Sequence, residues 1–331
     1  MGIDRLVLRQ NLPKNKKILV VLLGATGTGK SRLSVDLATH FSPCEIINSD
    51  KIQLYRGLPI LTNKMPVEER RGVPHHLIDE YDSVDGELTA GDFRLLAASR
   101  VSDIWSRKSL PILVGGSNSY IHAFLTKHFD SNSEGLDFES VVSAEIRYDC
   151  CFLWLYVSPS VHKEYINLGV QQMLDAGMLE ELSKFFEMEM ETPPIGVKKS
   201  IGVPEFERYF KVFPPVNTDG KSSVKNGFTD TNGDTISNSR HLEPYDAAIR
   251  KILLEEAIQN MKENAYKLAK KQVEKIEALR SCGWNILKLD ATEVIQTRLT
   301  AEPDSAKSSK LIWEKKIVEP SIKIIKQFLE E

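Results

Sequence analysis

A glycine-rich octapeptide at residues 24–31 restricts the possible folds of this chain more strongly than any other segment. It matches GxxxxGK[ST], in which glycines let backbone N–H groups curl around phosphate at a helix N-terminus. The apolar run 18–23 before it is typical of a buried parallel strand, and the apolar stripe within 32–40 after it is typical of a helix. A strand, loop and helix in this order is the setting of a true P-loop. The octapeptide therefore predicts an α/β fold with a phosphate site at the start of its first long helix.

Further strands and helices alternate along the first half of the chain. Strand patterns occur at 45–48, 111–114 and 151–157, and a helical pattern covers 90–106. Strands that alternate with helices predict a parallel sheet covered on both faces. Helical periodicity dominates from residue 161 onward. The expected fold class is α/β: a P-loop NTPase-like parallel sheet flanked by helices, with a smaller helical second domain.

The length of 331 residues favours more than one domain. The segment 214–240 is rich in Asn, Asp, Gly, Ser and Thr, which predicts a mobile insertion. The expected parts are an N-terminal extension at 1–17, a P-loop core domain at 18–160, a helical substrate-covering domain at 161–280 that holds the insertion, and a C-terminal segment at 281–331 that returns to the core.

Composition excludes several classes of protein. A net charge of -3 argues against a surface that binds nucleic acid broadly, so any polyanion site is expected to be local. No apolar run reaches bilayer length, so no membrane partner is expected. The four cysteines are too irregularly spaced for a disulfide framework or a zinc site. The adjacent His75 and His76 are expected to make structural hydrogen bonds rather than to chelate a metal.

The P-loop supplies the first candidate site residues. Lys30 is expected to neutralise phosphate oxygens, and the Ser31 hydroxyl is expected to bind Mg²⁺. The strand 111–114 runs into glycines instead of the Asp that usually holds Mg²⁺ in an NTP hydrolase. Asp50, after the second strand, is the first acidic residue placed to reach the P-loop, because ligands of such sheets lie at the carboxyl ends of the strands.

Ordered motifs beyond the P-loop resemble the isopentenyltransferases, a family that includes tRNA dimethylallyltransferases and the plant adenylate isopentenyltransferases of cytokinin biosynthesis. The resemblance covers most of the chain. It rests on the octapeptide and on residues 46–55, 62–64, 74–77, 111–117 with Tyr120, and 201–202 with Glu205.

The resemblance implies that the P-loop holds the diphosphate of dimethylallyl diphosphate with Mg²⁺, rather than a nucleotide being hydrolysed. The implied donor-binding residues are Gly27, Thr28, Gly29, Lys30 and Ser31. Charge grows on the diphosphate as the allylic C–O bond breaks, so Lys30 also has a catalytic role. By resemblance, Asp50 is the general base for the adenine N6 amine, and Thr26 lies beside the donor diphosphate and the acceptor. Ser49 is expected next to Asp50 in the acceptor site.

Departures from the tRNA-modifying members bear on the acceptor. Residues 50–53 read Asp-Lys-Ile-Gln where bacterial tRNA enzymes typically have Asp-Ser-x-Gln, and no zinc finger follows Cys282 as in eukaryotic ones. Lysines stand where tRNA enzymes commonly carry Arg, and a compact ammonium suits a terminal phosphate. The candidates for the acceptor's polyphosphate are Lys199, Lys271 and Lys275. Gly169 stands where many relatives have Arg, and the sequence leaves the role of that Arg open.

The leading interpretation is an enzyme that transfers dimethylallyl to the N6 amine of adenine in free ATP or ADP and releases diphosphate. The alternatives are a tRNA dimethylallyltransferase, a small P-loop kinase and a nucleotide-gated binding module. The sequence leaves open whether ATP or ADP is the preferred acceptor, and whether the prenyl donor carries a hydroxyl group. The protein is expected to be a monomer without a nucleic-acid partner. By resemblance it is placed in the plastid, with the cytoplasm as the alternative.

Overall fold

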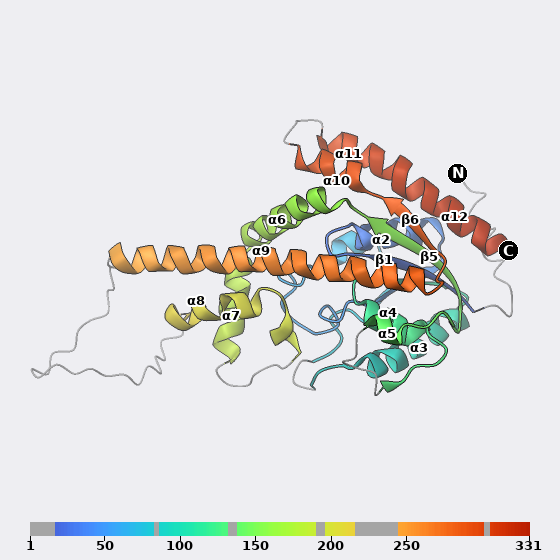
Figure 1. Ribbon diagram of the computed structural model, residues 1–331, viewed down its shortest axis with the longest axis horizontal. Helices are drawn as coiled ribbons and strands as arrows, with labels where there is room; N and C mark the ends of the chain where they lie inside the picture. The colour runs from blue at the N-terminus through green and yellow to red at the C-terminus, as the bar shows by residue number, and fades with distance from the viewer. Residues whose placement is uncertain (1–16, 83–85, 132–137, 190–195, 216–243, 301–304) are drawn as a thin grey trace, which may run out of the picture.

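The computed structural model describes residues 17–82, 86–131, 138–189, 196–215, 244–300 and 305–331 (Figure 1). Within them, six strands form one parallel sheet in the order β3-β2-β4-β1-β5-β6. Their bounds are β1 Ile18–Gly24, β2 Cys44–Asn48, β3 His75–His76, β4 Leu110–Val114, β5 Asp149–Tyr156 and β6 Ile286–Asp290. The N-terminal extension and nearly all of the insertion at 214–240 lie outside the described residues.

Helices cover both faces of the sheet, as the sequence predicts (Figure 1). One face packs against α2 (Lys30–His40) and the C-terminal helices, which are α10 (Thr292–Leu299), α11 (Ser305–Trp313) and α12 (Glu319–Glu330). The other packs against α3 (Ala90–Ser106), α4 (Asn118–Leu125) and the end of the long helix α9 (Pro244–Ser281). The remaining helices are α5 Phe138–Val141, α6 Pro159–Asp175, α7 Met178–Glu189, α8 Val203–Val212, the 3-10 turns η1 Val67–Arg70 and η4 Val197–Lys199, and the π-helical η5 Glu314–Val318.

The central strands form where the sequence has continuous aliphatic runs. Every residue of β1 is buried, with Val20 and Leu22 facing one apolar layer and Leu19 and Val21 facing the other. A strand buried on both faces needs such a run, because successive side chains alternate between the faces. The edge strand β6 has no comparable signal, since only Ile286 and Leu289 of its five residues are buried. The sequence accordingly predicts β1, β2, β4 and β5 but not β6.

A separate apolar cluster holds the helical part of the molecule together. Helices α7 and α8 pack against the first half of α9 around Leu182, Phe206 and Met261, all of which are buried. Tyr55, from the segment after β2, joins this cluster. The smaller helical unit expected from the sequence is therefore present, whereas its exact boundaries stay a prediction. No helix among the described residues combines the length and apolar character that a membrane span requires.

The side chain of Trp313 connects the C-terminal helices to the P-loop. Trp313, at the end of α11, is 2% exposed and packs against Gly29, and its Nε1–H donates to the Asp36 carboxylate at 2.8 Å. The guanidinium of Arg32 lies over the same ring, 4.6 Å from its centroid. Trp313 thus ties the last part of the chain to the first turn of α2.

Trp313→Ala is expected to lower the free energy of unfolding by about 3–5 kcal/mol, because it removes a buried ring and leaves a cavity. Leu311→Ala is the matched control on the same helix, where the side chain is 57% exposed, and it is expected to change stability by less than about 0.5 kcal/mol. Urea unfolding of the two variants measures the difference. Equal losses would show that the contact with the P-loop contributes little.

Candidate active site

A cavity of about 1560 Å³ opens at the carboxyl ends of β1, β2 and β4. Helices α6 and α9 and the turn η4 complete its walls. It brings together most of the residues that the sequence predicts for the site: Thr26, Gly27, Gly29, Lys30, Ser31, Asp50, Lys199, Lys271 and Lys275. Segments from opposite ends of the chain therefore meet at one site.

The P-loop forms the floor of this cavity between β1 and α2. Gly27 and Gly29 have φ angles of 77° and 94°, in the left-handed region that favours glycine. No side chain of the described residues caps the N-terminus of α2, so its first N–H groups are available to an anion. The Thr28 hydroxyl instead donates to the Ala25 carbonyl at 2.8 Å and is buried. Thr28 is not among the residues that line the cavity, so a contact of its side chain with the donor stays a prediction that the geometry does not favour.

The Lys30 ammonium is buried within the P-loop, and Asp50 neutralises its charge only in part. Its side chain is 8% exposed, and Nζ donates to the Ala25 carbonyl at 2.6 Å. Burial lowers the pKa of Lys30 to about 8, and the negative charge of Asp50 only partly opposes that effect. A phosphate anion in the loop would supply the missing charge and stabilise the ammonium form.

A hydrogen-bonded clamp holds the peptide groups of Thr26. Its N–H donates to the Gln272 side-chain oxygen on α9 at 2.8 Å, and its carbonyl accepts from His162 Nε2 on α6 at 2.7 Å. Asn118 Nδ2 in turn donates to the Gln272 carbonyl at 3.0 Å. The sequence alone does not mark His162, Gln272 or Asn118 as site residues. Gln272 directly follows the candidate Lys271, but no local pattern shows that its side chain reaches the P-loop.

Asp50 is fixed by the turn that follows β2. Its Oδ1 accepts from the N–H groups of Ile52 and Gln53 at 3.0 and 3.4 Å, while its own N–H donates to Asn48 Oδ1 at 3.1 Å. In the described part of the chain no hydrogen bond engages Oδ2, which faces Gly116. One carboxylate oxygen thus anchors the side chain and the other is available to a ligand.

Ser49 occupies a different position from the other candidates. It is fully buried, its N–H donates to the Val114 carbonyl at 2.8 Å, and it does not line the cavity. Its hydroxyl is buried against Gly115 and has no hydrogen-bond partner within the described ranges. Gly115 has no room for a Cβ there, so a glycine at this position permits the close approach of the Ser49 backbone. A direct contact of Ser49 with an acceptor stays a prediction that the geometry does not favour.

The three candidate lysines reach the cavity from two segments. Lys271 and Lys275 are one turn apart on α9, and Lys275 Nζ donates to Ser119 Oγ at 2.8 Å. Lys199, in η4, pairs with the carboxylate of Glu87, which also binds Lys51. The Lys199 bond, followed by the Lys51 bond, holds the pKa of Glu87 below its ordinary value. Glu87 therefore competes with any phosphate for these two ammonium groups.

The donor set at the P-loop fits Mg²⁺ better than a transition metal. No cluster of three His, Cys, Asp or Glu side chains suited to a metal exists among the described residues. The Ser31 hydroxyl lines the cavity at the start of α2, and Mg²⁺ takes oxygen ligands, with substrate phosphate and water completing its coordination. The histidines are structural, as expected: His75 binds the Val73 carbonyl and His76 binds Glu45, each at 2.8 Å.

Comparisons with known proteins agree with this arrangement. The IPP transferase family model matches residues 53–143 and 129–277. An adenylate isopentenyltransferase of Humulus lupulus is 47% identical, over 94% of this chain and 90% of that protein. The chloroplastic adenylate isopentenyltransferase 1 of Arabidopsis thaliana is 44% identical, over 97% and 84%.

The chain belongs to the IPP transferase family. Solved structures of family members share its fold. A eukaryotic dimethylallyltransferase acting on tRNA superposes with a TM-score of 0.69 at 23% identity, over 95% of this chain and 80% of that one. A tRNA isopentenylpyrophosphate transferase of Bacillus halodurans gives a TM-score of 0.60 at 23% identity, over 93% and 99%. At this identity the likeness supports the P-loop NTPase-like fold and no more.

Diphosphate affinity is expected to fall as pH rises above about 8, by up to about tenfold per pH unit, because the free protein then loses the proton of Lys30 that the complex requires. Titration calorimetry with inorganic diphosphate between pH 7 and 9.5 measures this. In Lys30→Arg the guanidinium stays charged, so the loss of diphosphate affinity that is due to Lys30 deprotonation is expected to vanish. Any effect from the titration of diphosphate itself is the same for the wild type and the variant. If the wild type and Lys30→Arg gave the same pH profile, the loss of affinity would belong to another group.

Proposed function

We propose that this protein transfers the dimethylallyl group of dimethylallyl diphosphate to the N6 amine of adenine in free ATP or ADP. The observation that carries the proposal is that Lys30 of the P-loop and the Asp50 carboxylate line one cavity. Relatives called adenylate isopentenyltransferase, 44–47% identical over nearly the whole chain, support the same reaction.

The donor half of the site stabilises the leaving group. The N–H groups at the start of α2 and the Lys30 ammonium surround the position of the diphosphate. Negative charge increases on those oxygens as the allylic C–O bond breaks, so the contacts strengthen in the transition state. The Ser31 hydroxyl would hold Mg²⁺, which supplies further charge neutralisation to the diphosphate when it is bound.

The acceptor half removes a proton. The adenine N6 amine is a weak nucleophile, because its lone pair is delocalised into the ring. Asp50 Oδ2 is available to accept the N6 proton, while Oδ1 stays bonded to the N–H groups of Ile52 and Gln53. These two bonds orient the carboxylate before the acceptor binds, which lowers the cost of reaching the reactive geometry.

The three candidate lysines on the cavity wall favour a small acceptor that carries a polyphosphate. Lys199, Lys271 and Lys275 line the cavity together with Asp50, so a nucleotide whose adenine reaches Asp50 can extend its phosphates toward them.

We propose that the protein acts as a monomer and, because several relatives are named chloroplastic, in the plastid.

The experiment that tests the function incubates the protein with dimethylallyl diphosphate and Mg²⁺, separately with ATP, ADP, AMP and unmodified tRNA. Mass analysis is expected to find a dimethylallyl adduct on ATP or ADP and release of diphosphate. Asp50→Asn is expected to lower kcat by about 10²-fold or more, the usual scale for a lost general base. A tRNA adduct alone would establish the tRNA reaction instead. ADP formed from ATP would indicate a kinase.

Acceptor preference is expected to depend on the three lysines. Replacing Lys199, Lys271 or Lys275 by Ala is expected to reduce kcat/KM for ATP and ADP about 10- to 150-fold more than for AMP, the scale of one charge-assisted hydrogen bond of about 1.5–3 kcal/mol. Lys270→Ala is the matched control, because Lys270 is exposed on α9 and does not line the cavity.

Glu87→Gln is expected to shift the preference in the opposite direction, toward ATP and ADP, because it releases Lys199 and Lys51 from a competing carboxylate. All of these proteins are compared in one assay that contains the three nucleotides in competition. A uniform loss for ATP, ADP and AMP, or no loss, would show that the lysines do not read the phosphate tail.

A further inference from the structure

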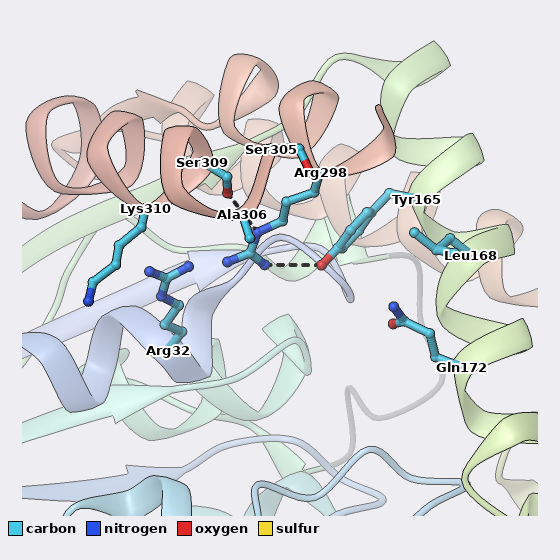
Figure 2. Close-up of a pocket in the computed structure, with 9 residues that line it drawn as sticks. All are labelled: Arg32, Tyr165, Leu168, Gln172, Arg298, Ser305, Ala306, Ser309 and Lys310. Carbon is cyan, nitrogen blue, oxygen red and sulfur yellow. Dashed lines mark hydrogen bonds between the residues drawn. The ribbon is translucent and has the colours of Figure 1, made fainter. Parts of the chain in front are cut away.

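A second cavity, of about 540 Å³, adjoins the P-loop cavity between α2, α6 and the C-terminal helices (Figure 2). Three cationic side chains and three hydroxyl-bearing side chains line it, and Figure 2 shows them around one space: Arg32, Arg298, Lys310, Ser305, Ser309 and Tyr165. Nothing in the proposed reaction uses this cavity.

The positive charge in this cavity is poorly neutralised. Arg298 donates to two neutral oxygens, from Nε to Ser309 Oγ at 3.0 Å and from Nη1 to Tyr165 Oη at 3.2 Å (Figure 2). Within the ranges that the structure describes, neither Arg298 nor Lys310 forms an ion pair. Arg32 has Asp36 at 3.9 Å, but that carboxylate also binds Arg71 at 2.9 Å.

The electrostatics of Arg32 agree with this geometry. Burial, and then the positive charge of Arg298, lower the pKa of Arg32 from its ordinary value. Two guanidinium groups that repel each other in a half-buried site are stabilised when a multiply charged anion lies between them. Planar guanidinium groups bind phosphate oxygens in a bidentate manner, and the neighbouring hydroxyls are further donors for a tetrahedral anion with several oxygens.

We propose that this cavity is a second anion site, which binds a phosphate-class oxyanion separately from the P-loop. The anion comes either from inorganic phosphate in solution or from diphosphate released in the neighbouring cavity. Arg32 directly follows Ser31 and lines both cavities, as do Tyr165 and Gln172, so the two sites are contiguous. The proposal concerns binding alone and does not depend on which acceptor the enzyme uses.

The test uses the 331-residue chain with Lys30→Ala and Lys271→Ala, which weaken the P-loop site and the proposed position of the acceptor phosphates, as the background for every variant. Titration calorimetry with inorganic phosphate and, separately, inorganic diphosphate is expected to show one remaining anion site. Arg298→Gln and Lys310→Gln are each expected to weaken it at least about tenfold, the effect of one lost charge-assisted bond. Ala306→Asp, which places a carboxylate in the cavity, is expected to abolish binding. Lys307→Gln, exposed on the same helix but off the cavity wall, is the matched control and is expected to bind normally.

Absence of any anion binding in this background would overturn the proposal, as would binding that survives all three cavity substitutions. If Arg298→Gln does not fold, Lys310→Gln and Ala306→Asp decide, because neither side chain makes a hydrogen bond that supports the cavity in the described structure. Tighter binding of diphosphate than of phosphate would assign the site to the released product, and equal binding would assign it to inorganic phosphate. Both results support the anion site.

Discussion

The hydrogen bonds to the Thr26 peptide are the contacts on which the rest of the site depends. The loop that follows β1 has no ladder partners, so its polar groups need other partners as the helices cover it. Gln272 and His162 supply them from α9 and α6. The same bonds fix both helices against the sheet. The lysines of α9 and the wall formed by α6 therefore hold a defined position relative to the P-loop.

Charge at the site is arranged so that ligands complete it. Lys30 is buried beside a carbonyl, with Asp50 as an incomplete countercharge, and the first turn of α2 is uncapped. In the proposed acceptor half, by contrast, Glu87 forms ion pairs with Lys199 and Lys51. An anion at the P-loop gains a charge interaction that is incomplete without it, whereas a phosphate at Lys199 must first displace a carboxylate. We therefore expect the two halves of the cavity to differ in their affinity for phosphate.

The sequence predicts those parts of the structure that have a local pattern. The aliphatic runs give the central strands, the octapeptide gives the P-loop, and Asp50 follows from the rule that ligands lie at the carboxyl ends of parallel strands. The Thr26 clamp has no such pattern, since its partners are 136 and 246 residues away in the chain. The burial of Ser49 likewise depends on Gly115, which a neighbouring strand brings against it. Tertiary packing decides both features, so neighbouring residues in the sequence carry no sign of them.

Helix α9 belongs to two apolar clusters at once. Leu253 and Met261 lie in the helical unit, whereas Ile276 and Leu279 lie in the layer beneath the sheet. Its 38 residues extend over about 57 Å, and Gln272 stands between the two clusters. One continuous helix therefore joins the helical unit to the sheet. A change in the packing of α7 and α8 against α9 would reach the Thr26 peptide through Gln272.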